Sequence, residues 1–407
     1  MIIFLDRVFL LLVLLTQLCS LSTANVVPLA ATNAPEQQRL ERRISSDLFD
    51  SLDELSRIVD IAYCIGTSGV QKPFHCLSHC RDFQGFELIE AWHTGPFLSD
   101  SCGYIALSHS PSPKRIVVAF RGTYSLPNAI ADLSAIPQEY VPFSVGNDTD
   151  NDNARKCTNC TVHLGFMNAW QSTRDTILET ISAARAKYPD YALTLVGHSL
   201  GGAVAALAGT EMKLRGWDAT VTTFGEPRVG NKAFVEFLDK TFHLDSDNAR
   251  DWKFQRVTHA NDPVPLVPLT EWGYEMHGGE IYISRVELPF SVEDVQYCEG
   301  ATDRECISGM ENGDTDSTSL SDRLLGLIPG GLDSGQQVIS DAVPQQESEN
   351  KEGAEALSQR LELPDTSRLP WNLLPPRFRL WELFYSHRDY FIRLGLCVPG
   401  GDPSGTC

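Results

Sequence analysis

Residues 191–209 read YALTLVGHSLGGAVAALAG and predict a β-strand, a sharp turn and an α-helix in direct succession. Tyr191 to Val196 are mostly apolar and prone to form a strand, and the alanines after Gly202 are typical of a closely packed helix. Between them, Gly197-His198-Ser199-Leu200-Gly201 has the G-x-S-x-G spacing. Glycine on either side lets strand and helix approach closely, so we expect a serine exposed on a strained turn.

Such a turn gives Ser199 the position of a nucleophile. Its hydroxyl would lie above the edge of a sheet, beside a helix N-terminus that favours developing negative charge. The pattern alone is weak evidence, and the alternative is a tight turn with an inert serine. The apolar strand before it and the small-residue helix after it favour the nucleophile. Its neighbour His198 is expected to point away as a structural group.

The composition is that of an acidic globular protein. The chain has 407 residues, is 42% hydrophobic and carries a formal net charge of −20. This length supports one large α/β core, and we expect one catalytic domain at 44–407. The negative charge argues against binding to nucleic acid and against electrostatic docking on anionic membranes. We therefore expect a neutral substrate and a monomeric protein.

The amino-terminal residues predict export from the cell. Met1 to Ala24 contains Arg7, an apolar run from Val8 to Leu15 and a small-residue ending, as a secretory signal peptide does. A membrane anchor is the alternative, but the apolar run is shorter than the roughly 20 residues that a span needs, so we expect no stable membrane insertion. Residues 25–43 end in Arg42-Arg43, which suggests a propeptide.

The cysteines agree with a secreted protein. The chain has 11 cysteines, and removal of Cys19 with the signal leaves ten, an even number that predicts disulfides. The segment 75–80, HCLSHC, could instead hold a metal ion. In an oxidising compartment its C-x3-C spacing favours a disulfide, and we predict no metal site. Asn147 and Asn159 each begin an N-glycosylation sequon.

A second site element follows the strand expected at Arg115–Phe120, which ends in Arg121-Gly122-Thr123. Loops at the carboxyl ends of buried strands carry ligand groups in open α/β sheets. The Thr123 N–H and hydroxyl would form half of an oxyanion hole, and the N–H of Leu200 the other half. Taken alone, this loop is an ordinary turn.

The next segment, 124–133, reads YSLPNAIADL and contains apolar Tyr124, Leu126 and Ile130. We expect a short lid helix that covers the serine in water and opens on a lipid surface. The alternative is a surface helix that rests on the core.

Asp262 and His387 are the candidate partners of Ser199. Asp262 comes just after a strand expected at Phe254–Thr258, which suits an acid that orients a histidine, although capping a turn is its alternative role. The base is expected after the acid in this fold class, which leaves His277 and His387. His277 precedes a strand, at the wrong edge of a parallel sheet, so His387 is the better candidate.

The composition changes after Cys306, where Ser, Asp, Glu, Gln and Gly dominate. We predict a disordered insertion at about 307–369. The apolar residues that follow it, among them Trp371 and Phe378, are expected to pack on the body, with a second lipid-contacting flap as the alternative.

Taken together, these motifs resemble the class 3 (fungal type) lipases, and most closely the extracellular yeast triacylglycerol lipases among them. The resemblance covers about Leu48 to Cys397 without the insertion. It rests on FRGT at 120–123, IADL at 130–133, VHLGF at 162–166, GHSLGG at 197–202, NDPVP at 261–265, and His387 followed by Tyr390-Phe391.

The resemblance implies an α/β-hydrolase with a mainly parallel central sheet, helices on both faces and a short lid helix. Carried over by position, the roles fall on residues that the motifs also indicate: Ser199 as nucleophile, Asp262 as acid, His387 as base, and Thr123 with Leu200 as oxyanion hole. The resemblance further implies the disulfides Cys64–Cys397, Cys76–Cys80, Cys157–Cys160 and Cys298–Cys306. A fifth pair, between Cys102 and Cys407, is a guess.

The sequence therefore predicts a secreted, extracellular serine ester hydrolase that needs no cofactor and acts on acylglycerols, above all triacylglycerols, at a lipid–water interface. A soluble esterase of the feruloyl esterase type and a phospholipase A1 are alternatives on the same fold. A non-catalytic secreted binding protein on a hydrolase scaffold is a more distant one. The apolar residues of the expected lid favour the lipase.

Overall fold

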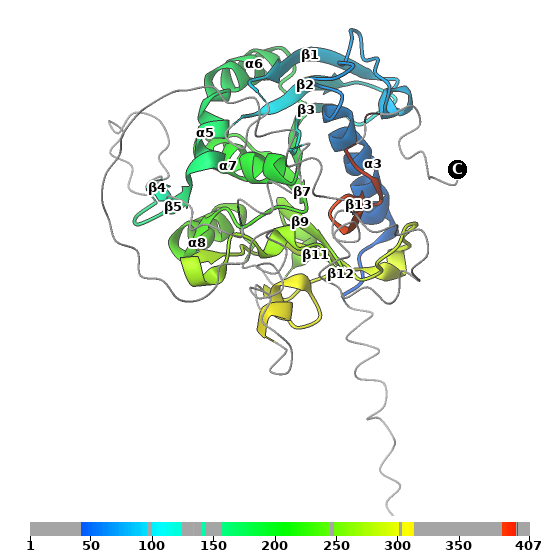
Figure 1. The fold of residues 1–407 in the computed structure, drawn as a ribbon. Helices are drawn as coiled ribbons and strands as arrows, with labels where there is room; N and C mark the ends of the chain where they lie inside the picture. The colour runs from blue at the N-terminus through cyan, green and yellow to red at the C-terminus, as the bar shows by residue number, and fades with distance from the viewer. Residues whose placement is uncertain are drawn as a thin grey trace, which may run out of the picture. The chain divides into compact units, whose positions relative to one another are not determined.

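An eight-stranded sheet in the order β1-β2-β3-β6-β7-β9-β11-β12 forms the centre of the fold (Figure 1). The computed structural model describes residues 42–95, 100–123, 133, 140–142, 157–244, 248–300, 303–312, 385–395 and 397. The chain divides into two compact units, Met1–Arg43 and Ile44–Cys407, and every element named below belongs to the second.

The strands of the large sheet are β1 (Phe86–His93), β2 (Cys102–Ser108), β3 (Arg115–Phe120), β6 (Ala192–His198), β7 (Ala219–Phe224), β9 (Phe254–His259), β11 (Glu280–Ile283) and β12 (Val295–Tyr297). Two small sheets contain β4 (Tyr140–Pro142), β5 (Thr161–His163), β8 (Gly230–Asn231) and β10 (Tyr274–Glu275), and β13 (Asp389–Tyr390) with β14 (Ile392–Arg393). The α-helices are α3 (Ser46–Ala62), α5 (Leu164–Gln171), α6 (Arg174–Lys187), α7 (Leu200–Leu214) and α8 (Lys232–Phe242).

Five neighbouring strands, β3, β6, β7, β9 and β11, run parallel. Every residue of β3 is buried, as expected of a strand that is covered on both faces. The flanking strands β1, β2 and β12 pair antiparallel. The prediction of a mainly parallel central sheet is therefore confirmed. Because the carboxyl ends of parallel strands meet at one edge, the residues that follow β3, β6, β7 and β9 gather there.

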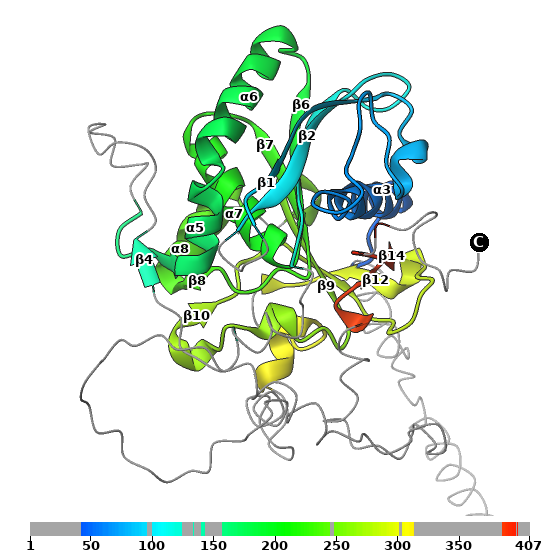
Figure 2. The ribbon, with the colours of Figure 1, turned by 45° about the horizontal axis from the view of Figure 1, so that its top comes forward.

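Alternate residues of the central strands enter two separate hydrophobic clusters. In β3, Ile116 and Val118 belong to a cluster with residues of α5, α6, α7 and α8, whereas Val117 and Ala119 belong to a cluster with residues of α3. The period of two along a strand sends neighbours to opposite faces. Figure 2 shows the result, with α5 to α8 on one side of the sheet and α3 on the other, so the expected helices on both faces are also confirmed.

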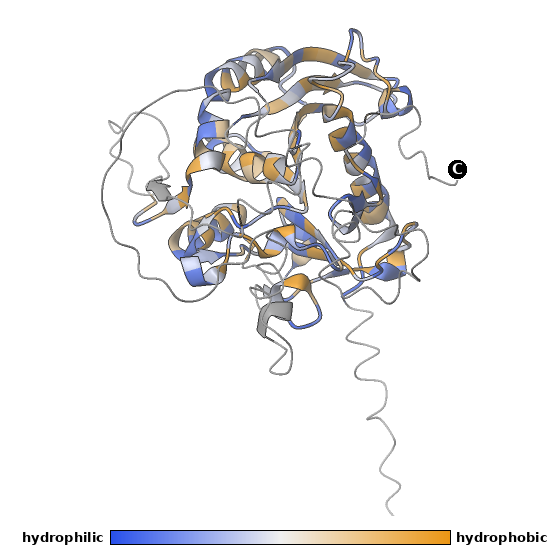
Figure 3. Cartoon of the chain, in the orientation of Figure 1, coloured by the Kyte–Doolittle hydropathy of each residue, from blue (hydrophilic) through white to orange (hydrophobic). Residues whose placement is uncertain are grey.

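The two helices that flank the central strands differ in character. Helix α7 is coloured as mainly apolar in Figure 3, and α3 shows both apolar and polar residues. The Ser45 hydroxyl caps α3 by accepting a hydrogen bond from the Leu48 N–H at 3.2 Å. One face of α3 buries Leu52, Ile58 and other apolar side chains against the sheet, each contributing about 1.5–3 kcal/mol relative to an exposed position.

Helices α5 and α6 follow each other closely in the chain but are separate helices. The break lies at Ser172 and Thr173. The Ser172 hydroxyl donates to the Ala169 carbonyl at 2.9 Å, and the Thr173 hydroxyl lies 3.5 Å from the Trp170 carbonyl. Hydroxyls that bond to nearby carbonyls compete with the helical hydrogen bonds, and here the chain turns at that point.

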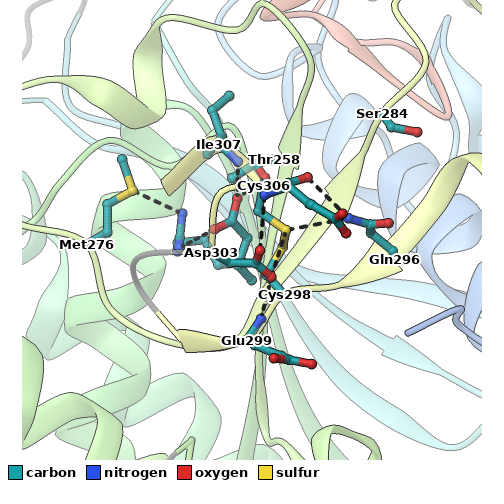
Figure 4. The surroundings of a disulfide bond; sticks show 12 residues. Thr258, Met276, Ser284, Gln296, Cys298, Glu299, Asp303, Cys306 and Ile307 are labelled. Atoms are coloured by element: carbon teal, nitrogen blue, oxygen red, sulfur yellow. Dashed lines mark hydrogen bonds and ion pairs between the residues drawn. A yellow bond between two sulfur atoms is a disulfide. The ribbon is translucent and has the colours of Figure 1, made fainter. Parts of the chain in front are cut away.

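Four disulfides join described cysteines: Cys64–Cys397, Cys76–Cys80, Cys157–Cys160 and Cys298–Cys306. Figure 4 shows the last of them, with Asp303 beside it. Asp303 and these two sulfur atoms are close enough to suggest a metal site, but both thiols are used in the disulfide. Cys102 carries a free, buried thiol, so the guessed pair with Cys407 is not supported.

Several expectations fall outside the described residues. They concern the signal peptide, the lid residues Tyr124, Leu126 and Ile130, the sequon at Asn147, and most of the insertion, of which only the 3-10 helix η8 (Ile307–Asn312) is described. Within the described part of the chain, helices that combine the length and the apolar character of a membrane span do not occur.

Candidate active site

Ser199 lies between β6 and α7 on a strained backbone, with φ 57° and ψ −129°. For a residue with a side chain this conformation is costly, and such strain persists where the surrounding structure holds it. The Ser199 N–H donates to the Phe224 carbonyl at 2.9 Å, and the Ser199 carbonyl accepts from the Gly202 N–H at 2.8 Å. A Cβ on Gly197 would collide with the backbone of Gly201. The strand and the helix therefore meet as the G-x-S-x-G spacing predicts.

The loop after β3 packs directly against this serine. A Cβ built on Gly122 would lie 2.8 Å from the Ser199 Cβ and 2.8 Å from the His198 carbonyl oxygen. The next residue, Thr123, has a buried hydroxyl oxygen without a hydrogen-bond partner among the described residues. Leu200 is the first residue of α7, so its N–H has no acceptor within the helix.

His387 and Asp262 form a fully buried pair, although 125 residues separate them. The His387 Nδ1 lies 2.9 Å from each carboxylate oxygen of Asp262. With its proton on Nδ1, the ring presents a lone pair at Nε2. That Nε2 atom is buried and has no partner within the part of the chain that the structure describes. The imidazole is thus held at one nitrogen and available at the other.

The end of β7 brings this pair to the serine. Phe224 accepts the Ser199 N–H, and a Cβ on the following Gly225 would lie 2.8 Å from the His387 Cε1 and 2.9 Å from the Asp262 Oδ2. Gly225 also has a φ of 58°, which favours glycine. Serine, histidine and carboxylate therefore all lie around the end of β7, although no hydrogen bond joins Ser199 to His387 in the described structure, because His387 Nε2 has no partner there.

Asp262 has two further donors besides His387. Its Oδ1 accepts the Val264 N–H at 2.9 Å, and its Oδ2 accepts the hydroxyl of Tyr390. Burial, together with the Asp262 charge, raises the pKa of Tyr390 well above its usual value, so this hydroxyl remains a donor. The sequence does not predict this role of Tyr390, which enters there only as part of a family motif. Its position three residues after His387 is the one signal that could have indicated it.

His198 holds the backbone of His387 from the side of β6. Its Nε2 lies 2.7 Å from the His387 carbonyl oxygen, and its Nδ1 lies 2.5 Å from the Tyr63 hydroxyl. Burial, and then the nearby charge of His387, lowers the pKa of His198 well below its ordinary value. A neutral ring donates from Nε2 and accepts at Nδ1. The structure thus places His198 in the role of a buried structural group.

The competing histidine has a different environment. His277 Nε2 lies 3.1 Å from the Glu226 carboxylate, and its Nδ1 lies 2.8 Å from the Gly278 carbonyl oxygen. Both ring nitrogens of His277 therefore have partners other than Asp262.

A nucleophile elbow after the central parallel strand, with an acid and a histidine at the same sheet edge, defines an α/β-hydrolase. A family profile described as "Lipase (class 3)" matches residues 117–272. The chain is 47% identical over 379 residues to the secreted mono- and diacylglycerol lipase 2 of Gibberella zeae. This match covers 89% of the chain and 85% of the relative. The chain is 45% identical to Lipase A of Sodiomyces alcalophilus, over 93% of this chain and 87% of the relative.

The chain belongs to the class 3 lipase family, as its motifs predict, and it is a serine carboxylic ester hydrolase. A solved structure, that of the Lip2 lipase from Yarrowia lipolytica, matches with a TM-score of 0.64 at 26% identity, over 88% of this chain and 97% of that one. Another, titled as a study of an unusual buried polar cluster in a family of fungal lipases, matches with a TM-score of 0.51 at 29% identity, over 63% of this chain and 88% of that one.

Proposed function

We propose that Ser199, Asp262 and His387 form the catalytic triad of a secreted lipase that hydrolyses acylglycerols. The observation that carries this proposal is the environment of His387. Its ring is fully buried, Nδ1 lies 2.9 Å from the Asp262 oxygens, and Nε2 has no partner among the described residues. An unpaired buried nitrogen is costly for stability, and it is the atom that a general base needs for an incoming hydroxyl.

In this reaction Ser199 Oγ attacks the ester carbonyl while His387 Nε2 takes its proton. Asp262, bonded to Nδ1, stabilises the imidazolium that forms. When the tetrahedral intermediate collapses, His387 returns the proton to the leaving alcohol and the acyl group remains on Ser199. Water then attacks the acyl-enzyme while His387 takes its proton. The fatty acid is released as the proton passes to Ser199. The steps use groups of this chain, the substrate and one water molecule.

The negative oxygen of the intermediate needs donors that are already in place. We assign this role to the N–H and hydroxyl of Thr123 and to the N–H of Leu200. The contact of Gly122 with Ser199 and the unpartnered Thr123 oxygen support this assignment. One such donor typically contributes a factor of about 10²–10³ to kcat.

The substrate class follows from the family and from the expected lid at 124–133. We propose triacylglycerols as substrates, met at a lipid–water interface. Partial glycerides are a second candidate, because the relatives from Gibberella zeae and Penicillium cyclopium are named mono- and diacylglycerol lipases. The names of both relatives also contain the word secreted, which supports removal of a signal peptide at residues 1–24 from this chain.

We further propose that Asn159 carries a glycan. Its side chain is exposed in the turn that the Cys157–Cys160 disulfide closes. The Asn159 carbonyl accepts a hydrogen bond from Asn231 Nδ2 at 2.8 Å, which holds the backbone of this turn. A loss of mass after endoglycosidase treatment of the secreted protein that is smaller in Asn159→Gln than in the wild type tests this assignment.

The central experiment compares hydrolysis rates on emulsified triolein, on diolein and on tributyrin below and above its solubility limit. Ser199→Ala and His387→Ala should each lower the rate by at least about 10⁴-fold. The matched control is His109→Gln, because His109 follows β2 at the opposite edge of the sheet.

Normal activity in Ser199→Ala would contradict the proposed triad. A rate that saturates smoothly and ignores the emulsion would indicate a soluble esterase, and a strong preference for diolein would indicate a partial glyceride lipase.

A further inference from the structure

His259 is a buried histidine at the end of β9, three residues before Asp262, and it lies outside the proposed triad. Its ring is fully buried. Its Nδ1 lies 2.7 Å from the carbonyl oxygen of Ser386, and its Nε2 lies 2.8 Å from the carbonyl oxygen of Arg285. Carbonyl oxygens only accept hydrogen bonds, so each of these bonds needs the proton on the ring nitrogen concerned.

The bond to Ser386 has a counterpart one residue further on. Ser386 and His387 have consecutive carbonyls, and each lies against a buried imidazole: His259 at the first and His198, at 2.7 Å, at the second. The two imidazoles come from different strands. His198 ends β6, which leads to Ser199, and His259 ends β9, which leads to Asp262. The backbone of His387 is therefore held between the strand of the nucleophile and the strand of the acid.

The segment around His387 has little regular structure that could fix it otherwise. β13 and β14 contain two residues each, and the Arg388 N–H bonds locally to the Tyr385 carbonyl at 2.8 Å. Contacts with the body must therefore set the position of His387. The ring of His259 also packs against Tyr390, at 5.8 Å between centroids, and against Phe290, at 5.2 Å.

We propose that His259 is a positioning residue for the proposed reaction: its bond from Nδ1 to the Ser386 carbonyl holds His387 where Nδ1 meets Asp262 and Nε2 is left for the proton of Ser199. This inference rests on the proposed triad. The Asp262 carboxylate and the His259 imidazole both come from the end of β9. This strand end therefore holds the side chain of His387 through Asp262 and the backbone beside it through His259. A displacement of about 1 Å at a reacting group can cost as much as 10²-fold in rate.

The second bond, from Nε2 to Arg285, joins the loop between β11 and β12 to the same ring. It contributes to packing at this place but does not act on the backbone of His387. The two bonds can be separated by substitution. The amide nitrogen of asparagine is as many bonds from Cα as Nδ1 is, and that of glutamine as many as Nε2 is.

The experiment measures kcat, KM and Tm for His259→Asn and His259→Gln with p-nitrophenyl butyrate, a soluble ester that needs no interface. We expect His259→Asn, which keeps the Ser386 bond, to retain kcat within about threefold of the wild type, and His259→Gln to lose about 10–100-fold in kcat at unchanged KM. Both variants lose one bond, so their Tm values should be similar. Ile181→Ala, in the buried face of α6, is the stability control and should lower Tm without lowering kcat.

The outcomes separate the two proposals. Equal kcat in the asparagine and glutamine variants, or a loss that follows Tm as in Ile181→Ala, would overturn the positioning role while an inactive Ser199→Ala leaves the triad intact. Activity in Ser199→Ala would overturn the triad, and the positioning role with it. If both His259 variants accumulate poorly, active-site titration with a phosphonate ester counts the folded molecules of His259→Asn and gives kcat per active molecule. A loss of kcat above about tenfold would contradict the proposal.

Discussion

The hydroxyl of Tyr390 donates a hydrogen bond to Oδ2 of Asp262, the same oxygen that lies 2.9 Å from Nδ1 of His387. The two side chains thus share one carboxylate oxygen, and Val264 supplies an N–H to the other. Asp262 is oriented from three directions in a site that excludes water.

Tyr390→Phe removes one of these three donors without changing the ring. We expect kcat to fall by about tenfold at unchanged KM, because a hydrogen bond to a charged group contributes about 1.5–3 kcal/mol and the carboxylate loses part of its orientation. Steady-state kinetics on a soluble ester would measure this. Tyr297→Phe, in β12, is the control and should leave kcat unchanged. An unaltered kcat in Tyr390→Phe would mean that His387 and Val264 alone orient Asp262.

Thr123→Val should reduce activity and preserve stability. The Thr123 hydroxyl is buried and has no partner among the described residues, so its removal costs the folded protein little. If it faces the oxyanion, kcat should fall by about 10²–10³-fold. Thermal unfolding and kcat are measured on the same sample. A lower Tm at normal kcat would place the hydroxyl in a structural role instead.

Gly122→Ala should displace the loop that carries Thr123. The new methyl group would collide with the Tyr63 hydroxyl and would lie 2.8 Å from both the Ser199 Cβ and the His198 carbonyl oxygen, so the loop, Tyr63 or the serine turn must shift. We expect a loss of kcat of about 10²-fold or more and a destabilisation of about 1–3 kcal/mol. Gly278→Ala is the matched control, because its nearest neighbour would be 3.2 Å away. Equal activity in both variants would argue against close contact between this loop and the serine.

The buried His163 should make the folded protein less stable in acid. Burial lowers its pKa from 6.5 to about 4, and its Nδ1 accepts the Phe166 N–H at the start of α5. Below pH 6.5 the unfolded chain binds a proton at this residue, while the folded protein does not until about pH 4. The free energy of unfolding should therefore fall as the pH decreases across this window, by about 3 kcal/mol from this residue.

The test is His163→Asn, which keeps a cap acceptor but does not titrate. Its unfolding free energy, measured by urea denaturation from pH 7 to pH 4, should decline less steeply than that of the wild type. Parallel curves for His163→Asn and the wild type would contradict the assignment.

The fold was predictable because its signals are local. The strand and helix around Ser199, the buried run of β3 and the amphipathic α3 each span fewer than about 20 residues, and their periodicity reports the environment directly. The break between α5 and α6 was not predicted, because serine and threonine at 172 and 173 are tolerated within helices and only their bonds to Ala169 and Trp170 reveal the turn.

The site was predictable only where topology restricts the choice. Asp262 follows a strand end and His387 follows Asp262, so the order of elements selected both. The partners that hold them gave no such signal. Tyr63, His259 and Tyr390 are single residues outside the G-x-S-x-G pattern, and their contacts join segments more than about 100 residues apart, which no pattern along the chain can report.

The Cys64–Cys397 disulfide joins the end of the first described helix to the residues just beyond His387, across a sequence separation of 333. The bond ties the segment that carries His387 to the body of the protein at a point ten residues beyond the histidine. Closure also requires an oxidant that the cytosol does not provide. We therefore expect the segment that carries His387 to be held less firmly, and the protein to be less active, when the Cys64–Cys397 bond is reduced.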